Sequence, residues 1–238
     1  MKKILLSVLM MGLVFIANAQ KTIVNDANAE KRNVGSFNGI RISNAIDLYL
    51  SQSDEEAVAV SAKEIKYRDR IKTEVVDGIL KIWVDNNGWS WTHGNLKMRA
   101  YVSVKLLTKL HASGASDVFV NGVLKVGDID VELSGASDFK EGAIEASNMN
   151  VHLSGASDMK VKGTAASLTV RASGASDFKG FDLTCQNGDV DASGASDINI
   201  TVEKEINAHA SGASDIRIKG NGVIRKMSNS GASSVKKI

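Results

Sequence analysis

The chain has 238 residues, with 29 lysines and arginines against 27 aspartates and glutamates, and Cys185 is its only cysteine. A net charge of +2 without a basic cluster gives no electrostatic footprint for nucleic acid or for anionic lipid. A single cysteine excludes an internal disulfide, so hydrogen bonding and packing must stabilise the fold.

The N-terminus has the three-part pattern of a secretory signal peptide. Residues 1–3 are a short basic start, residues 4–16 form an apolar run, and residues 17–19 are a small-x-small cleavage signal. The apolar run is too short to span a bilayer comfortably, and no later segment approaches ~20 consecutive apolar residues. We therefore expect residues 1–19 to be a signal peptide and residues 20–238 to be an exported single domain without stable membrane insertion.

Short β-segments are predicted in the region that follows, residues 20–107. Apolar positions between Ile40 and Leu50 alternate with polar ones, and Asp77-Gly78 sits between two apolar runs as a hairpin turn would. We expect this region to form a β-rich cap. Such a cap would cover the first coil of the repeats, which would otherwise expose an unpaired strand edge.

The three tryptophans of this aromatic-poor chain and one of its three tyrosines lie close together within the cap region. They are Trp83, Trp89, Trp91 and Tyr101. Paired tryptophans in a glycine-bracketed loop are good sugar-stacking or protein-contact residues. These four residues are our ligand-contact candidates, and the alternative is that they cover the open end of the core.

A tetrapeptide repeats through residues 108–238 at a near-constant step. Ser-Gly-Ala-Ser begins at Ser113, Ser134, Ser154, Ser173, Ser193, Ser211 and Ser230. Aspartate follows the first six copies, at Asp117, Asp138, Asp158, Asp177, Asp197 and Asp215. The steps are 21, 20, 19, 20, 18 and 19 residues, so the seven copies indicate one repeating structural unit.

Between the motifs, apolar residues alternate with polar ones. Ile129, Val131 and Leu133 are separated by Asp130 and Glu132, a period of two that predicts strands with one buried face. A step of about 20 residues with two short strands and two turns is one coil of a β-solenoid. We therefore predict an all-β fold, a parallel β-helix with seven coils, right-handed because parallel crossovers prefer that hand.

Stacking of the coils would place the motif residues in continuous rows. Serine hydroxyls would bond along the stack, and the aspartates would form an acidic row. The residue two positions after the aspartate is basic in four copies, at Lys140, Lys160, Lys179 and Arg217. Period two places these cations beside the aspartates, where each exposed pair contributes ~0–1 kcal/mol and offsets their repulsion. We interpret the serines and aspartates as a structural ladder, with bound calcium as the alternative.

The row two positions before each motif is less regular. Stacking would bring Glu132 between His111 and His152, a conceivable zinc or nickel site. A solvated outward row of alternating charge explains the same residues, so we predict no metal and no other cofactor.

The motif could also suggest a nucleophilic serine with an acid. Catalysis needs one serine held by one base, whereas this chain has seven equivalent copies. Cys185 has no neighbouring cation to lower its pKa, so we expect it to be inert. The sequence therefore predicts no catalytic residue and no enzyme activity.

Several of these motifs together resemble the head GIN domain family, described as auto-transporter adhesins. The matching elements are Val34-x-x-Phe37-x-x-Ile40-x-Ile42, Ile46-Asp47-Leu48, Asp77-Gly78-x-Leu80-x-Ile82 and the repeated Ser-Gly-Ala-Ser-Asp. The resemblance covers most of the mature chain. It implies a parallel β-helix-like fold, a non-enzymatic surface or periplasmic role, and no catalytic residue.

We therefore expect an exported structural or binding protein of the cell envelope, periplasmic, on the outer surface or extracellular. Its partner would be a protein or a glycan, and self-association through its flat sides or ends would give a homo-oligomer. The alternatives are a carbohydrate-active β-helix enzyme, which rests on fold analogy, and a calcium-stabilised surface protein.

Overall fold

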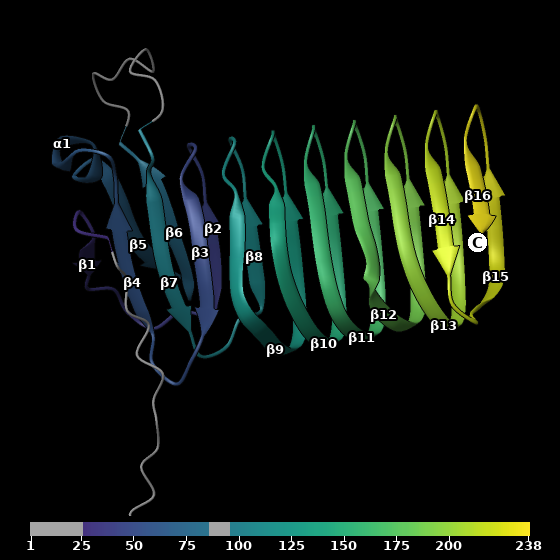
Figure 1. The fold of residues 1–238 in the computed structure, drawn as a ribbon, viewed down its shortest axis with the longest axis horizontal. Coiled ribbons are helices and arrows are strands. Elements are labelled where there is room, and N and C mark those ends of the chain that lie inside the picture. Colours follow the sequence, from purple (N-terminus) through teal and green to yellow (C-terminus); the bar gives the residue numbers. More distant parts are fainter. Residues whose placement is uncertain (1–25, 86–95) are drawn as a thin grey trace, which may run out of the picture.

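The computed structural model describes residues 26–85 and 96–238. Within these ranges the chain is nearly all β-structure and forms a β-solenoid of about six turns (Figure 1). The predicted fold class, an all-β solenoid with coils of about 20 residues, is confirmed. None of the helices in the described part is long and apolar enough to cross a membrane.

Each repeat coil consists of one long strand and one Ser-Gly-Ala-Ser turn. These strands are β9 (Val118–Leu133), β10 (Phe139–Leu153), β11 (Asp158–Ala172), β12 (Asp177–Ala192) and β13 (Asp197–Ala210). The expectation of two short strands per coil was wrong here, because parallel pairing continues around the second bend with only local register shifts. The last coil does divide, into β14 (Asp215–Lys219) and β15 (Val223–Asn229), and is followed by β16 (Ser234–Lys237).

A single hydrophobic core runs through the solenoid, built from rows of equivalent side chains. The residue that follows each aspartate of the motif belongs to one such row, which consists of Val118, Phe139, Met159, Phe178, Ile198 and Ile216. All six are essentially buried. Burying a side chain of this size stabilises the fold by ~1.5–3 kcal/mol, so each coil is held mainly by contacts with its two neighbours.

The N-terminal part contains shorter elements. They are β1 (Glu30–Arg32), β2 (Gly39–Ile42), β3 (Asp47–Gln52), β4 (Ala57–Ser61), α1 (Ile65–Arg68), β5 (Ile71–Val76), β6 (Ile79–Val84), β7 (Arg99–Val104) and β8 (Lys109–Ala112). The predicted hairpin is confirmed, since β5 and β6 pair in antiparallel register around Asp77 and Gly78, both at positive φ. Strands β1 and β4 add an antiparallel edge beside β7.

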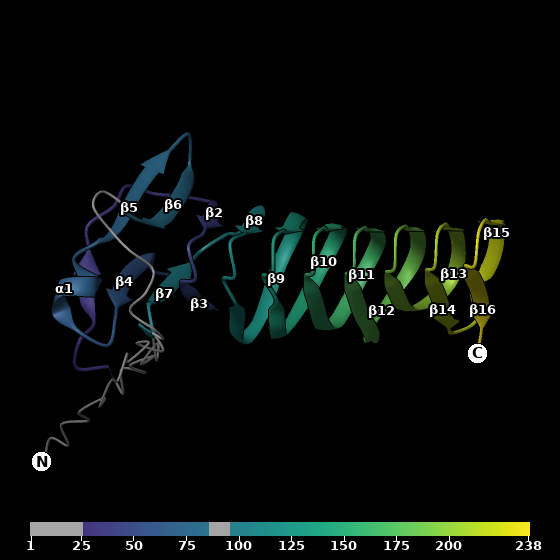
Figure 2. The same cartoon turned by 90° about the horizontal axis from the view of Figure 1, so that it is seen from above.

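The strand order of the solenoid departs from the chain order at this end (Figure 2). Strand β2 pairs with β6 on one side and β8 on the other, and β3 lies between β7 and β9. The segment from β2 to β3 is therefore inserted as a coil directly before the first Ser-Gly-Ala-Ser coil.

The turn of this inserted coil is a divergent copy of the repeat. Its sequence Ser43-Asn44-Ala45-Ile46-Asp47 aligns with Ser113-Gly114-Ala115-Ser116-Asp117, and the N–H of Ala45 donates to the carbonyl of Gly114 at 2.9 Å. Asn44 and Gly114 have φ of 68° and 64°, and the two alanines also have positive φ. Asparagine tolerates this left-handed conformation better than most residues do, so it can replace glycine here.

Candidate functional site

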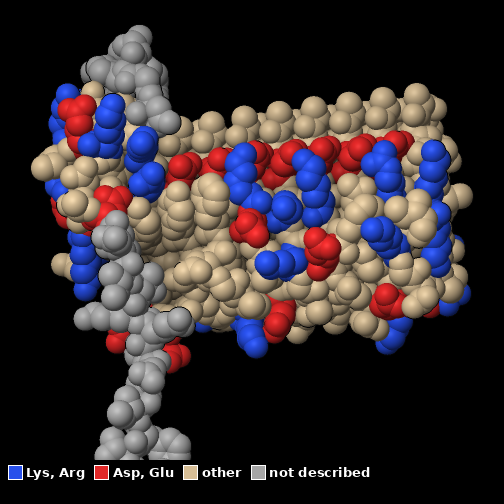
Figure 3. Space-filling model, in the orientation of Figure 1, with Lys and Arg blue, Asp and Glu red and all other residues tan. Residues whose placement is uncertain are grey.

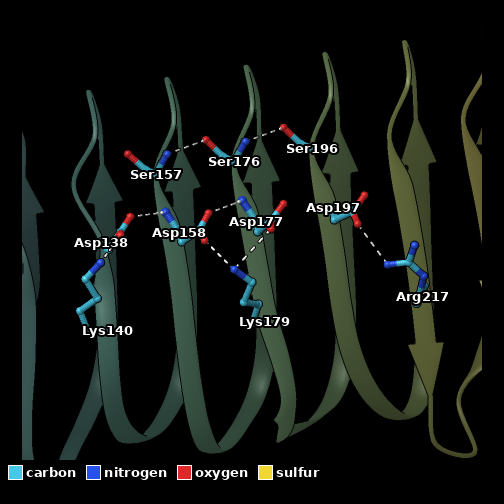
Figure 4. A network of polar contacts seen from close by, with 10 residues as sticks. All are labelled: Asp138, Lys140, Ser157, Asp158, Ser176, Asp177, Lys179, Ser196, Asp197 and Arg217. Atoms are coloured by element: carbon cyan, nitrogen blue, oxygen red, sulfur yellow. Dashed lines mark hydrogen bonds and ion pairs between the residues drawn. The ribbon is translucent and has the colours of Figure 1, made fainter. Parts of the chain in front are cut away.

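The second serines of the first six motifs form a buried ladder. Ser116, Ser137, Ser157, Ser176, Ser196 and Ser214 are fully buried. The Oγ of Ser176 accepts a hydrogen bond from the N–H of Ser157 at 3.3 Å, and the Oγ of Ser196 accepts one from the N–H of Ser176 at 3.3 Å (Figure 4). Among the described residues, the Oγ of Ser157 is a buried hydroxyl without a hydrogen-bond partner, so the ladder is interrupted there.

The first serine of each motif, which the sequence analysis named, lies nearer the surface. These residues are Ser113, Ser134, Ser154, Ser173, Ser193, Ser211 and Ser230, all half-buried or exposed. The Oγ of Ser173 donates to the carbonyl of Leu153 at 3.4 Å, and the Oγ of Ser193 donates to that of Ala172 at 3.4 Å. The buried position of the second serine was not predicted, although period two counted back from Val118 places Ser116 on the inward side.

The six motif aspartates form a row along one edge of the solenoid, directly beside the turns (Figure 3). The carboxylate of Asp138 accepts a hydrogen bond from the N–H of Asp158 at 2.8 Å, and that of Asp158 accepts one from the N–H of Asp177 at 3.3 Å. Each of these two carboxylates therefore holds the backbone of the next coil. At the C-terminal end, Ser234 donates to Asp215 at 2.6 Å.

Three cations each bridge two successive aspartates of this row. Lys140 pairs with Asp138 and with Asp117, Lys179 with Asp158 and Asp177, and Arg217 with Asp197 and Asp215. Figure 4 shows the bridge made by Lys179 and one contact each of Lys140 and Arg217. The second contact of each bridge is 3.5, 3.4 and 2.9 Å long respectively. The hydrogen bond to Asp158 raises the pKa of Lys179, and that to Asp138 raises the pKa of Lys140. Each cation therefore offsets the repulsion between two neighbouring aspartates and balances half of their charge.

The inserted coil extends the acidic row by one residue. The N–H of Leu48 donates to the carbonyl of Asp117 at 2.7 Å, which places the Asp47 carboxyl next to the first motif aspartate. Burial, together with the charge of Asp117, raises the pKa of Asp47 above its ordinary value.

The histidine row lies on the other wall, just before the turns. His111 Nδ1 is 2.9 Å from Glu132 Oε2, and His152 is in register with Glu132. A shallow depression of about 580 Å³ borders Glu132, His152, Arg171 and Asp191. In the two described segments, no group of three or more histidine, cysteine or acidic side chains is arranged to hold a metal ion.

Two of the predicted aromatic contact residues, Trp89 and Trp91, lie outside the described residues. Trp83 lies half-buried on β6, opposite Lys72 of β5, whereas Tyr101 lies on β7 in the other wall (Figure 2). The Tyr101 hydroxyl donates to Asp26 at 2.9 Å, and burial followed by this bond raises the pKa of Tyr101. The structure therefore separates Trp83 from Tyr101.

Tyr101 instead belongs to a stack of three rings that the sequence analysis did not find. Its ring lies 5.3 Å from that of Tyr49, and the Tyr49 ring lies 5.0 Å from that of Phe119, with interplanar angles of 28° and 12°. These residues come from β7, β3 and β9, adjacent strands that are far apart in the chain. The sequence alone does not give the register of β3 with β7 and β9, and it is this register that places the three rings side by side.

The stack ends at a second, smaller depression of about 380 Å³. Its walls come from β9, β10 and β11, and its lining includes Phe119, Val120, Val123, Glu141 and Lys162. Figure 3 shows an uncharged area on this face, between the cap and the charged side chains of the coils. Cys185, by contrast, is buried in the core, and burial raises the pKa of its thiol to about 12.

The described residues thus form a flat-walled β-solenoid with polar ladders beside its turns and two depressions in its walls. The family model described as "Putative auto-transporter adhesin, head GIN domain" matches residues 36–222. The chain belongs to this family, which confirms the resemblance noted from the sequence.

Solved structures share the fold. A "putative adhesin" from Bacteroides fragilis has a TM-score of 0.79 and 22% identity, covering 88% of this chain and 96% of its own. A "putative adhesin" from Parabacteroides distasonis has a TM-score of 0.69 and 19% identity, with 89% and 96% covered. A "Putative lipid binding protein" from the same species has a TM-score of 0.66 and 21% identity, with 90% and 98% covered. The comparison with curated proteins gives no match.

Proposed function

We propose that this protein is an exported, non-catalytic, adhesin-like binding module of the cell envelope. The observation that carries the proposal is the repetition of its polar chemistry. Asp158 and Asp177 share Lys179 in the same way that Asp197 and Asp215 share Arg217. These repeated charged side chains join each coil to the next, and the stacked coils form a stiff rod with flat walls.

Membership of a family of adhesins supports this reading, as do the adhesin names of the structural neighbours. The apolar start of the sequence and its small-x-small site support export by the secretory route.

An enzyme would need one distinguished site in place of equivalent copies. The buried motif serines Ser176 and Ser196 accept hydrogen bonds from backbone amides. The motif aspartates contact lysine, arginine or the backbone of a neighbouring coil. A carbohydrate-active β-helix enzyme needs a cleft with clustered acids and aromatic platforms, whereas both depressions here are shallow.

Binding and turnover can be measured on the same sample. Purified mature protein is coated on beads, and the beads are incubated with host cells, with bacterial cells and with a panel of polysaccharides. The proposal predicts saturable retention on at least one of these surfaces, without release of new reducing ends or unsaturated sugars. Release of products, or retention on none of the surfaces, contradicts it.

A further inference from the structure

The aromatic stack of Tyr101, Tyr49 and Phe119 is open at one end. In the next coil, the residue in register with Phe119 is Glu141, so no fourth ring continues the stack within the described residues. The far side of Phe119 borders the depression of about 380 Å³. A planar, apolar-faced ring from a ligand could occupy the position that a fourth aromatic side chain would take.

An irregularity in the strands creates this space. The register between β10 and β9 shifts twice, so that Val120, Asn121 and Gly122 of β9 lie opposite Gly142 alone. Gly122 has a φ of 85°, a conformation that most other residues avoid. Bulges of this kind commonly re-aim side chains beside functional sites. Register shifts also occur between later coils, and the one between β9 and β10 borders this depression.

The lining of the depression combines an apolar floor with a polar rim. Phe119, Val120 and Val123 supply apolar surface, and the Val123 side chain is 40% exposed, which is unusual for a large apolar residue of this chain. Glu141 and Lys162 are both exposed at the rim and carry opposite charges. Ligand sites typically pair such an apolar surface with a few polar groups that fix orientation.

A pyranose ring meets these requirements. Its C–H face packs against an aromatic ring, its hydroxyl hydrogens suit a carboxylate acceptor, and its hydroxyl oxygens suit an ammonium donor. We propose that the depression beside Phe119 is a glycan-binding site, in which one sugar ring continues the Tyr101–Tyr49–Phe119 stack between Glu141 and Lys162. The inference deepens the proposed binding function and rests on it. The larger depression beside His152 has no phenylalanine, tyrosine or tryptophan ring in its lining, so it lacks this feature.

The test begins with a glycan array, followed by titration calorimetry with the best-bound oligosaccharide. Phe119→Leu removes the stacking ring but keeps apolar bulk, and Glu141→Gln and Lys162→Gln alter only the exposed rim. We expect Phe119→Leu and Glu141→Gln each to weaken binding about tenfold or more, equivalent to about 1.4 kcal/mol. Phe181→Leu is the matched control, because Phe181 is an aromatic residue partly exposed beneath Lys219, on β12.

The outcomes separate the site from the function. If the wild type binds an oligosaccharide and all three site variants bind it as well, the proposed site is wrong while the binding function stands. If the beads adhere to cells but the protein binds no carbohydrate, the proposed ligand class is wrong. The same conclusion follows if the protein binds only free aromatic compounds. Melting curves identify any variant that fails to fold. If Phe119→Leu fails to fold, the two rim variants still test the site.

Discussion

Gly174 lies so close to Gly155 that a Cβ atom on Gly174 would be 2.5 Å from the carbonyl oxygen of Gly155. The N–H of the residue after Gly174, Ala175, donates to that same carbonyl at 2.8 Å. The motif glycine is therefore required both for its φ of 80° and for the close approach of successive turns.

Gly174→Ala is expected to lower the free energy of unfolding by more than about 1–2 kcal/mol, the cost of the left-handed conformation alone. Gly127 is the control, because a Cβ atom there meets nothing within 4 Å. Gly127→Ala should leave stability unchanged or raise it slightly. Chemical denaturation of both variants checks this, and equal effects would contradict the close packing of the turns.

The serine ladder offers an equally close comparison. Ser176→Ala removes the acceptor of the buried Ser157 N–H, which should cost about 1–3 kcal/mol. Ser157→Ala removes a buried hydroxyl that has no partner in the described structure, so it should be neutral or stabilising. Thermal unfolding of the two variants, both buried Ser→Ala changes, distinguishes them, and a reversed order would refute the ladder.

Lys179→Met retains the apolar stem but removes the charge shared by Asp158 and Asp177. Because the side chains are partly exposed, the expected loss is only ~0.2–1 kcal/mol, and it should shrink in 1 M salt. Because the pKa of Lys179 is raised in the folded protein, this stabilisation is fully present below pH 10.5. It is lost as the pH rises through the folded-state pKa.

Lys160→Met is the control for the previous change, since no ion pair of Lys160 is found among the described residues. A loss of stability as large as that of Lys179→Met, or one insensitive to salt, would show that bridging of two aspartates is not the cause. Urea titrations at low and high salt provide the comparison.

Asp47 differs from Lys179 because its charged form is unfavourable in the folded protein. The pKa of Asp47 is raised above 3.8, so the folded protein binds this proton more tightly than the unfolded chain does. Stability therefore falls as the pH rises from 3.8 through the folded-state pKa. Asp47→Asn should therefore raise the melting temperature at pH 7, and the gain should disappear below pH 3.8. An unchanged or lower melting temperature at pH 7 would mean that the Asp47 charge is not unfavourable in the fold.

The repeated part of the fold could be predicted because each coil contains its own signal. The tetrapeptide fixes the step, and the alternation around residues such as Val131 fixes the buried face. The charge bridges also followed from spacing, since Lys179 lies two positions after Asp177. The continuous bent strands could not be predicted, because glycines such as Gly163 suggest a break in the strand although its hydrogen bonds continue.

The inserted coil and the aromatic stack were missed for a common reason. Sequence order says nothing about which coil lies next to which when the chain leaves the stack and returns. Tyr101, Tyr49 and Phe119 become neighbours only because β3 is inserted between β7 and β9. The divergent turn at Asn44 was recognisable in principle, but its motif shares only Ser, Ala and Asp with the repeat.

The central claim is that the repeated residues brace the rod while binding is confined to the non-repeated depression beside Phe119. Two double variants, Asp177→Asn with Lys179→Gln and Glu141→Gln with Lys162→Gln, separate these roles when melting temperature and oligosaccharide affinity are measured together. The first pair should melt lower but bind like the wild type, and the second should melt like the wild type but bind at least about tenfold more weakly. Loss of binding in the first pair with retention in the second would contradict the claim.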